Sequence, residues 1–151
     1  MKGASMKVVY IAGPFRGPTP WDVECNIRDA EGLALAVAQA GAMPLCPHTM
    51  MRYFDKQCTD GFWLEGALEL LRRCDAVLFA ELWEESKGSV GEHEEAVRRG
   101  MPVFYETGFE ELEQLEQWLQ SGEYRCLEDP VVVRPRGQDR VRQQHRCHRE
   151  R

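Results

Sequence analysis

The sequence predicts an α/β domain in which helices cover both faces of a parallel sheet of about four to five strands, a three-layer sandwich. Short apolar segments rich in β-branched and aromatic residues alternate with longer segments whose apolar residues recur at helical spacing. The segments between the strands are long enough for the helical crossovers that parallel neighbours require. These two observations favour a parallel sheet.

The first predicted strand spans residues 7–13 and stops at Gly13-Pro14, as a buried strand entering a loop would. The first predicted helix spans residues 26–40, where the apolar residues form one stripe, and the following Gly41 suits a C-cap. We expect the second strand at residues 42–47, ending at His48.

The alternation continues beyond a polar loop that runs through Asp60. The remaining predicted elements are a helix at about 62–73, a strand at 74–81, a loop at 82–88, a helix at 89–100, a strand at 101–105 and a helix at 109–120. Thr107 and Glu110 have the spacing of a capping box before the last helix.

Length and composition indicate one domain with an appendage. A chain of 151 residues that is 43% hydrophobic fits one core. We assign residues 1–122 to the domain and residues 123–151 to a basic C-terminal extension, whose many arginines and few apolar residues predict partial disorder. The formal net charge of -6 speaks against nonspecific nucleic-acid binding.

Composition also predicts a cytoplasmic protein with no cofactor and no membrane partner. No apolar run approaches the roughly 20 residues of a membrane helix, and the N-terminus lacks a signal peptide. The six cysteines form no CxxC pair, so we interpret them as reduced thiols. His145, Cys147 and His148 cluster in the extension but lack a second half with ligand spacing, so no metal site is expected.

The segment from Ser86 to Glu92 is the strongest candidate site, because ligands of parallel sheets bind beyond the carboxyl ends of the strands. Small residues such as Gly88 let a ligand approach the backbone, and a helix N-terminus offers free N–H groups to anions. A capping box from Ser89 to Glu92 is the alternative explanation, and local spacing alone favours it. The location favours a functional role.

Other candidates lie in the loops at the same edge. Arg16, between Gly13 and Gly17, could hold a phosphate through paired hydrogen bonds or be an ordinary surface residue. Tyr10 lies on a strand, and its hydroxyl could reach a carboxylate. His48 either contacts a ligand or only ends a strand.

Three tryptophans flank these loops and could stack on a nucleobase, although packing is their commoner role. Trp83 is the first choice because it shares a loop with Ser86, ahead of Trp21 and Trp63. Asp75 opens a strand, a position that usually faces the opposite edge from the strand's end.

An ordered set of motifs resembles the nucleoside 2-deoxyribosyltransferase superfamily, especially its short bacterial and phage branch. The motifs are Tyr10-Ile-Ala-Gly-Pro, Cys74-Asp75, Trp83-x-x-Ser86-x-Gly88-x-x-x-Glu92-x-x-x-Ala96 and Gly100-x-Pro102-Val103. The resemblance covers about residues 7–105 and implies a flavodoxin-like or Rossmann-like fold. It implies that Glu92 attacks the anomeric carbon, that Tyr10 orients Glu92, and that Asp75 positions the sugar or protonates the departing base.

The chain is also similar to the deoxynucleoside 5′-phosphate N-glycosidases of this superfamily. That similarity implies that Arg16 and Ser86 hold a 5′-phosphate. The chain departs from the pattern at Pro14, where those relatives carry serine, and at Gly91, where tyrosine or methionine is common.

The resulting hypothesis is cleavage of the N-glycosidic bond of a nucleoside 5′-monophosphate or nucleoside, by hydrolysis or base transfer, through a covalent glycosyl intermediate on Glu92. A non-catalytic nucleotide-binding module and an NAD glycohydrolase remain alternatives. The resemblance further implies a homodimer or higher homo-oligomer, for which residues 109–133 are candidates to lend residues to a neighbouring site.

Overall fold

The computed structural model describes residues 5–106 and 109–120. In this part of the chain four strands form one parallel sheet in the order β2-β1-β3-β4. The strands are β1 (Val8–Ala12), β2 (Met43–Leu45), β3 (Ala76–Phe79) and β4 (Val103–Tyr105). The sheet confirms the predicted α/β sandwich and the lower of the two expected strand numbers.

Helices connect the strands as crossovers. They are α1 (Pro20–Gln39), α2 (Pro47–Met50), α3 (Asp60–Leu71), α4 (Lys87–Arg98) and α5 (Phe109–Leu119), with a short 3₁₀ helix, η1 (Trp83–Glu85), before α4. None of the helices in the described ranges is both long and apolar enough to cross a bilayer.

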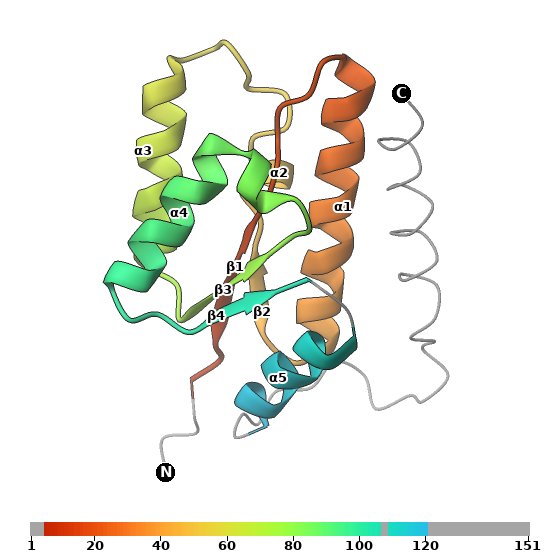
Figure 1. Ribbon diagram of the computed structural model, residues 1–151, viewed down its shortest axis with the longest axis vertical. Coiled ribbons are helices and arrows are strands. Elements are labelled where there is room, and N and C mark those ends of the chain that lie inside the picture. Colours follow the sequence, from red (N-terminus) through yellow and green to blue (C-terminus); the bar gives the residue numbers. More distant parts are fainter. Residues whose placement is uncertain (1–4, 107–108, 121–151) are drawn as a thin grey trace.

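The helices form two layers, with α1 and α5 on one side of the sheet and α3 and α4 on the other (Figure 1). Alternate residues of β1 face opposite layers, because successive side chains of a strand point in opposite directions. Val9 and Ile11 pack in the core beneath α1 and α5, whereas Tyr10 and Ala12 pack toward α3 and α4. The sheet therefore sends Tyr10 to the side on which α4 lies.

Helix α1 begins earlier than residue 26, the start that its apolar stripe predicts. Thr19 is the N-cap, and its hydroxyl and the Asp22 carboxylate form a reciprocal capping box, with Pro20 in the first turn. At the other end Gly41 has a φ of 100°, a conformation that favours glycine, and follows the C-cap Ala40. Gly41 therefore helps to end the helix, but one residue beyond the C-cap position predicted for it.

The N-terminus of α4 also differs from the capping box of Ser89 and Glu92 that local spacing favours. Ser86, not Ser89, is the N-cap, and its hydroxyl accepts a hydrogen bond from the Ser89 backbone N–H at 3.4 Å. Glu92 therefore lies beyond the first helical turn, and the capping box from Ser89 to Glu92 is wrong. Thr107, the first residue of the predicted capping box with Glu110, and the predicted extension at residues 123–151 lie outside the described residues.

The chain order creates a switch point between β1 and β3. From β1 the chain crosses to β2 on one side, and the later β3 pairs with β1 on the other side. Loops that leave β1 and β3 in opposite directions open a crevice at the carboxyl edge of the sheet. Gly13 and Ala80 line that crevice, with the loop after β1 on one side and η1 and α4 on the other.

Candidate active site

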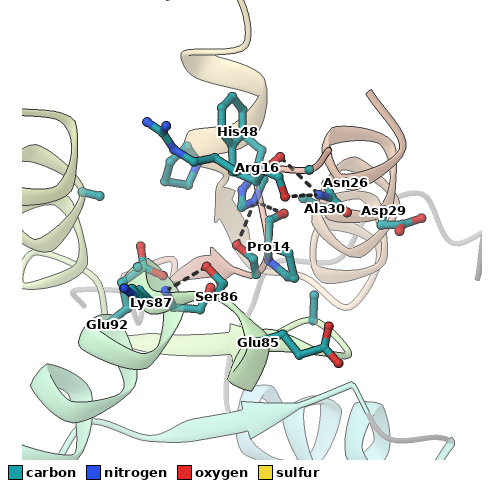
Figure 2. Close-up of a pocket in the computed structure, with 18 of the residues that line it drawn as sticks. Pro14, Arg16, Asn26, Asp29, Ala30, His48, Glu85, Ser86, Lys87 and Glu92 are labelled. Atoms are coloured by element: carbon teal, nitrogen blue, oxygen red, sulfur yellow. Dashed lines mark hydrogen bonds between the residues drawn. The ribbon is translucent and has the colours of Figure 1, made fainter. Parts of the chain in front are cut away.

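A pocket of about 700 Å³ occupies this crevice. Eight of the ten predicted site residues line it, namely Tyr10, Gly13, Arg16, Gly17, His48, Ser86, Gly88 and Glu92. Figure 2 shows Ser86, Lys87 and Glu92 on one side of Pro14, and Asp29 on the other side. The volume lies within the range of roughly 300–1,000 Å³ that is common for small-molecule sites.

Glu92 is held in the pocket by Tyr10. The Tyr10 hydroxyl donates a hydrogen bond of 2.5 Å to Glu92 Oε1. Tyr10 itself is fully buried in the sheet, so its ring has no freedom to follow a moving carboxylate. This pair fixes one Glu92 oxygen and leaves Oε2 for another partner.

Burial dominates the electrostatics of this pair. Loss of solvation raises the pKa of Glu92 to about 7, although the Tyr10 hydrogen bond opposes the rise. Burial, followed by the nearby Glu92 charge, raises the pKa of Tyr10 well above its ordinary value. Tyr10 is consequently a hydrogen-bond donor at neutral pH, and Glu92 changes between acid and carboxylate near neutrality.

The start of α4 forms the floor beside Glu92. Ser86, Lys87 and Gly88 line the pocket there. Gly88 lies close to α3, because a Cβ at this position would come within 3.2 Å of Leu64 Cδ2. The first turn of α4, with its N–H groups and partial positive charge, thus lies at the pocket.

Arg16 is paired with acids across the mouth of the pocket. Its guanidinium lies 2.5 Å from Asp60 Oδ1, at the start of α3, and 3.7 Å from Asp55 Oδ1. All three side chains are well exposed, so this cluster remains accessible to solvent and to ligands. A phosphate at Arg16 would have to compete with two carboxylates.

His48 supports the loop after β1. Its Nε2 lies 3.1 Å from the Gly13 carbonyl and 3.0 Å from the Pro14 carbonyl (Figure 2). Because both partners can only accept, Nε2 carries the hydrogen. Burial lowers the pKa of His48, which favours this neutral form. His48 is 7% exposed and lines the pocket, and it lies in α2 rather than at the end of β2, where the sequence predicts it.

Two glycines shape the same loop through close contacts. A Cβ on Gly13 would lie 2.7 Å from Ala80 Cβ, and one on Gly17 would lie 2.4 Å from Asp22 Cβ. Such approaches exclude any side chain without movement of the backbone. The loop can thus pass tightly between β3 and α1 and present Arg16 to the pocket.

A carboxyl cluster of Asp29, Glu81 and Glu106, which the sequence does not predict, lines the pocket beyond Pro14. Glu106 accepts a hydrogen bond from the Glu81 backbone N–H at 3.1 Å. Burial, with the charges of Glu81 and Asp29, raises the pKa of Glu106 to about 7. Burial, with Glu81, raises the pKa of Asp29 to about 6. The position of Glu106, directly after β4, is the one sequence signal that points to this edge.

Two predicted site residues do not reach the pocket. Asp75 lies before β3, at the amino edge of the sheet, where its Oδ2 accepts a hydrogen bond from the Val8 N–H at 2.8 Å and its Oδ1 lies 3.6 Å from Lys7 Nζ. It is not among the residues that line the pocket. The expectation that Asp75 joins Glu92 is not met, and Asp75 is left out of the site proposed below.

Trp83 is the second correction. Its ring stacks on His93, with centroids 4.4 Å apart, and packs against Phe79 at 5.0 Å. It is partly buried in the core and does not line the pocket, so packing explains its place. Trp63 lines the pocket instead, and its ring stacks on Phe54 with centroids 6.0 Å apart.

The side chains of the described ranges contain no grouping of three or more His, Cys, Asp or Glu residues that could hold a metal ion. The pocket itself is lined by acids, hydroxyls and backbone N–H groups. Two cations, Arg16 and Lys87, line it. The acids that line it are Asp29, Asp55, Asp60, Glu81, Glu85, Glu92 and Glu106.

Comparisons with known proteins add a family but no activity. A search among curated proteins found no match. The family model described as "Domain of unknown function (DUF7768)" matches residues 7–106, which contain all four strands and the whole lining of the pocket. The chain belongs to this family.

Proposed function

We propose that this protein cleaves the N-glycosidic bond of a nucleoside or nucleoside 5′-monophosphate, with Glu92 as the covalent nucleophile. The observation that carries the proposal is the half-buried carboxyl of Glu92, held at 2.5 Å by the hydroxyl of the fully buried Tyr10 within a pocket at the switch point of the sheet. A strongly perturbed carboxyl in such a pocket is a favoured candidate for catalysis.

The chemistry matches the needs of glycoside cleavage. Oε2 of ionised Glu92 would attack the anomeric carbon, and the bond from this carbon to the base nitrogen would break with its electrons leaving on the base. Water would then attack the same carbon, release the carboxylate, and supply the hydroxyl of the sugar and the proton of the base. If a second base attacks in place of water, the reaction is a base transfer.

The electrostatics of the pocket support this reaction type. Cleavage develops positive charge on the sugar, and a desolvated carboxylate stabilises such charge more strongly than one in water. Acids outnumber cations along the lining, which favours a transition state that gains positive charge. The Tyr10 hydroxyl would hold Glu92 in line for attack by donating a hydrogen bond to it. Because the pKa of Tyr10 is raised, this hydroxyl stays protonated and does not act as a base.

The central experiment measures free base released from nucleosides, nucleoside 5′-monophosphates and NAD by the purified full-length chain. Glu92→Ala should abolish release, whereas Glu94→Ala, which changes an exposed carboxylate of the same helix, should retain it. Formation of a new nucleoside after addition of a second base would identify transfer. Undiminished release by Glu92→Ala would refute the assignment.

The same panel separates the competing functions. Release of nicotinamide from NAD alone would favour an NAD glycohydrolase, since a carboxylate nucleophile serves both reactions. Tight nucleotide binding without release of any base would favour a non-catalytic binding module. Gly91, one of the two departures from the resembled pattern, motivates this alternative. Nothing lies within 4 Å of a Cβ built at this position, so the space there is open.

We also propose that the protein works as a homo-oligomer. Within one chain the inner face of α5 is already used, because Leu115 and Leu119 pack in the core beneath the sheet. Any residues that α5 lends to a neighbour must therefore come from its outer face. Gel filtration of the full chain and of a chain ending at Gly122 tests this, and unchanged mass and activity would exclude a role for the segment beyond.

A further inference from the structure

The described part of the chain has four buried side-chain polar atoms without a hydrogen-bond partner, and all four belong to residues that line the same pocket. The atoms are Asp29 Oδ1, His48 Nδ1, Trp63 Nε1 and Ser89 Oγ. Buried polar groups in folded proteins are nearly always paired, because an unpaired one loses its hydrogen bonds to water without replacement. The location of all four residues in one pocket indicates that a bound ligand supplies the missing hydrogen-bond partners.

Ser89 is the most buried of the four, at 1% exposure. Its backbone N–H is satisfied by the Ser86 hydroxyl, but its own hydroxyl has no partner among the described residues. The residue lines the pocket, although its hydroxyl oxygen is buried. A hydroxyl both donates and accepts, so it is suited to another hydroxyl or to a ring oxygen.

The position of Ser89 relates it to the proposed nucleophile. Ser89 precedes Glu92 by three positions on α4, and residues three apart lie on the same face of a helix. Both side chains line the pocket. A ligand whose reacting carbon lies against Glu92 would therefore place its neighbouring atoms beside Ser89.

We propose that Ser89 is a substrate-binding residue whose hydroxyl hydrogen-bonds a hydroxyl of the sugar while Glu92 faces the anomeric carbon. The identity of the ligand rests on the proposed function; the unpaired state of the Ser89 hydroxyl does not. Sugar hydroxyls near the reacting carbon are effective points of recognition, because hydrogen bonds there strengthen as the glycosidic bond breaks.

The test uses Ser89→Ala, which removes the hydroxyl and little else. In the absence of ligand, the melting temperature of Ser89→Ala should lie between that of the wild type and about 3 °C above it. An unpaired polar group is lost, and alanine is the better helix former. Ser86→Ala is the matched control on the same helix. It removes a capping hydroxyl and should lower the melting temperature.

The second readout is the interaction with substrate. The KM of Ser89→Ala for the best nucleoside or nucleotide should rise about fivefold to tenfold, the effect of one lost hydrogen bond. Comparison of ribose with 2′-deoxyribose substrates would show whether the 2′-hydroxyl is the partner. An unchanged KM, or a melting temperature below that of the wild type, would overturn the proposal.

Failure of the proposed function would be visible separately. If the wild type releases no base, the enzyme assignment fails, and thermal stabilisation by the same nucleosides and nucleotides becomes the readout for Ser89. Weaker stabilisation of Ser89→Ala than of the wild type would still support a binding role. Equal stabilisation of both, or none of the wild type, would overturn it.

Discussion

Tyr10 and Glu92 lie 82 positions apart and are joined by a hydrogen bond of 2.5 Å between the phenolic hydroxyl and Oε1. The bond links the central strand β1 to α4, so the position of the carboxyl depends on the sheet rather than on a surface loop. Because Tyr10 lowers the pKa of Glu92 while burial raises it, the pair sets the pH at which Glu92 ionises.

Tyr10→Phe tests this control of ionisation. Loss of the donor should raise the pKa of Glu92 further above about 7, because the hydrogen bond is its opposing, lowering influence. The ascending limb of kcat/KM against pH should therefore move to higher pH, with a loss of about 10-fold to 100-fold at neutral pH from a hydrogen bond to a charged group. Partial recovery at pH 9 is expected. A limb that stays in place would show that another group titrates.

Glu92→Gln should change stability in a pH-dependent way. The folded protein holds the Glu92 proton more tightly than the unfolded chain does, because the pKa rises from 4.5 to about 7 on folding. The wild type therefore loses stability as pH rises between these values, while glutamine stays neutral. The variant should match the wild type at pH 4 and exceed it at pH 8 by about 1–3 kcal/mol, given about 1.4 kcal/mol for each tenfold change in proton affinity.

Urea denaturation across pH 4 to 8 measures this difference. Glu94→Gln is the matched control, because it removes an exposed carboxylate of the same helix and should show no such rise. The contributions of Asp29 and Glu106 are common to wild type and variant and cancel in the comparison. If Glu92→Gln were uniformly less stable at every pH, burial would not govern the Glu92 carboxyl.

The ion pairs of Arg16 lead to a prediction about phosphate. Asp60 and Asp55 neutralise the guanidinium at the mouth of the pocket. The double substitution Asp60→Asn and Asp55→Asn should free Arg16 for an anion and raise kcat/KM for a 5′-monophosphate relative to its nucleoside by about threefold to tenfold, the scale of exposed charge interactions. Arg16→Ala should lower the same ratio.

The kinetic comparison is made at low and at high salt, because the gain at an exposed site should shrink as salt screens it. A ratio that does not respond to any of these substitutions would remove Arg16 from the proposed phosphate site. Melting temperatures accompany the kinetics, since Asp60 also lies in the first turn of α3, where an acid is favourable.

The sequence predicts the fold better than it predicts the site, for physical reasons that particular residues illustrate. The apolar stripe predicts α1 from residue 26, whereas the helix begins at Pro20, and the capping-box spacing of Thr19 and Asp22 is the signal of that earlier start. Glu92 and Tyr10 were identified from resemblance and lie together. Hydrophobic periodicity reports which face of an element is buried, and it carries little information about polar edges.

The sequence does not predict the partners of Arg16 or the carboxyl cluster of the pocket. Asp55 and Asp60 reach Arg16 through the folding of an irregular segment that has no periodicity to read. Asp29 occupies a helical position that in sequence is indistinguishable from a solvated face. Trp83 and Trp63 exchange their expected roles, since the choice between packing and lining depends on how η1 and α3 meet the sheet. Tertiary contacts decide all of these.

The tight passage of the loop beside β3 gives the last prediction. Gly13→Ala would place a Cβ 2.7 Å from Ala80 Cβ, where both atoms are attached directly to backbone and cannot rotate away. We expect a destabilisation of about 1–3 kcal/mol and a loss of activity, because β1 and β3 must separate at the mouth of the pocket.

Gly91→Ala is the matched control within the same site region. Nothing lies within 4 Å of a Cβ added at Gly91, and the residue lies inside α4. Alanine should therefore stabilise the helix by about 0.5–1 kcal/mol. The two substitutions add the same methyl group and should change the midpoint of urea unfolding in opposite directions. Equal midpoints for the two variants would mean that the loop yields to the added methyl group and that the contact between Gly13 and Ala80 does not shape the pocket.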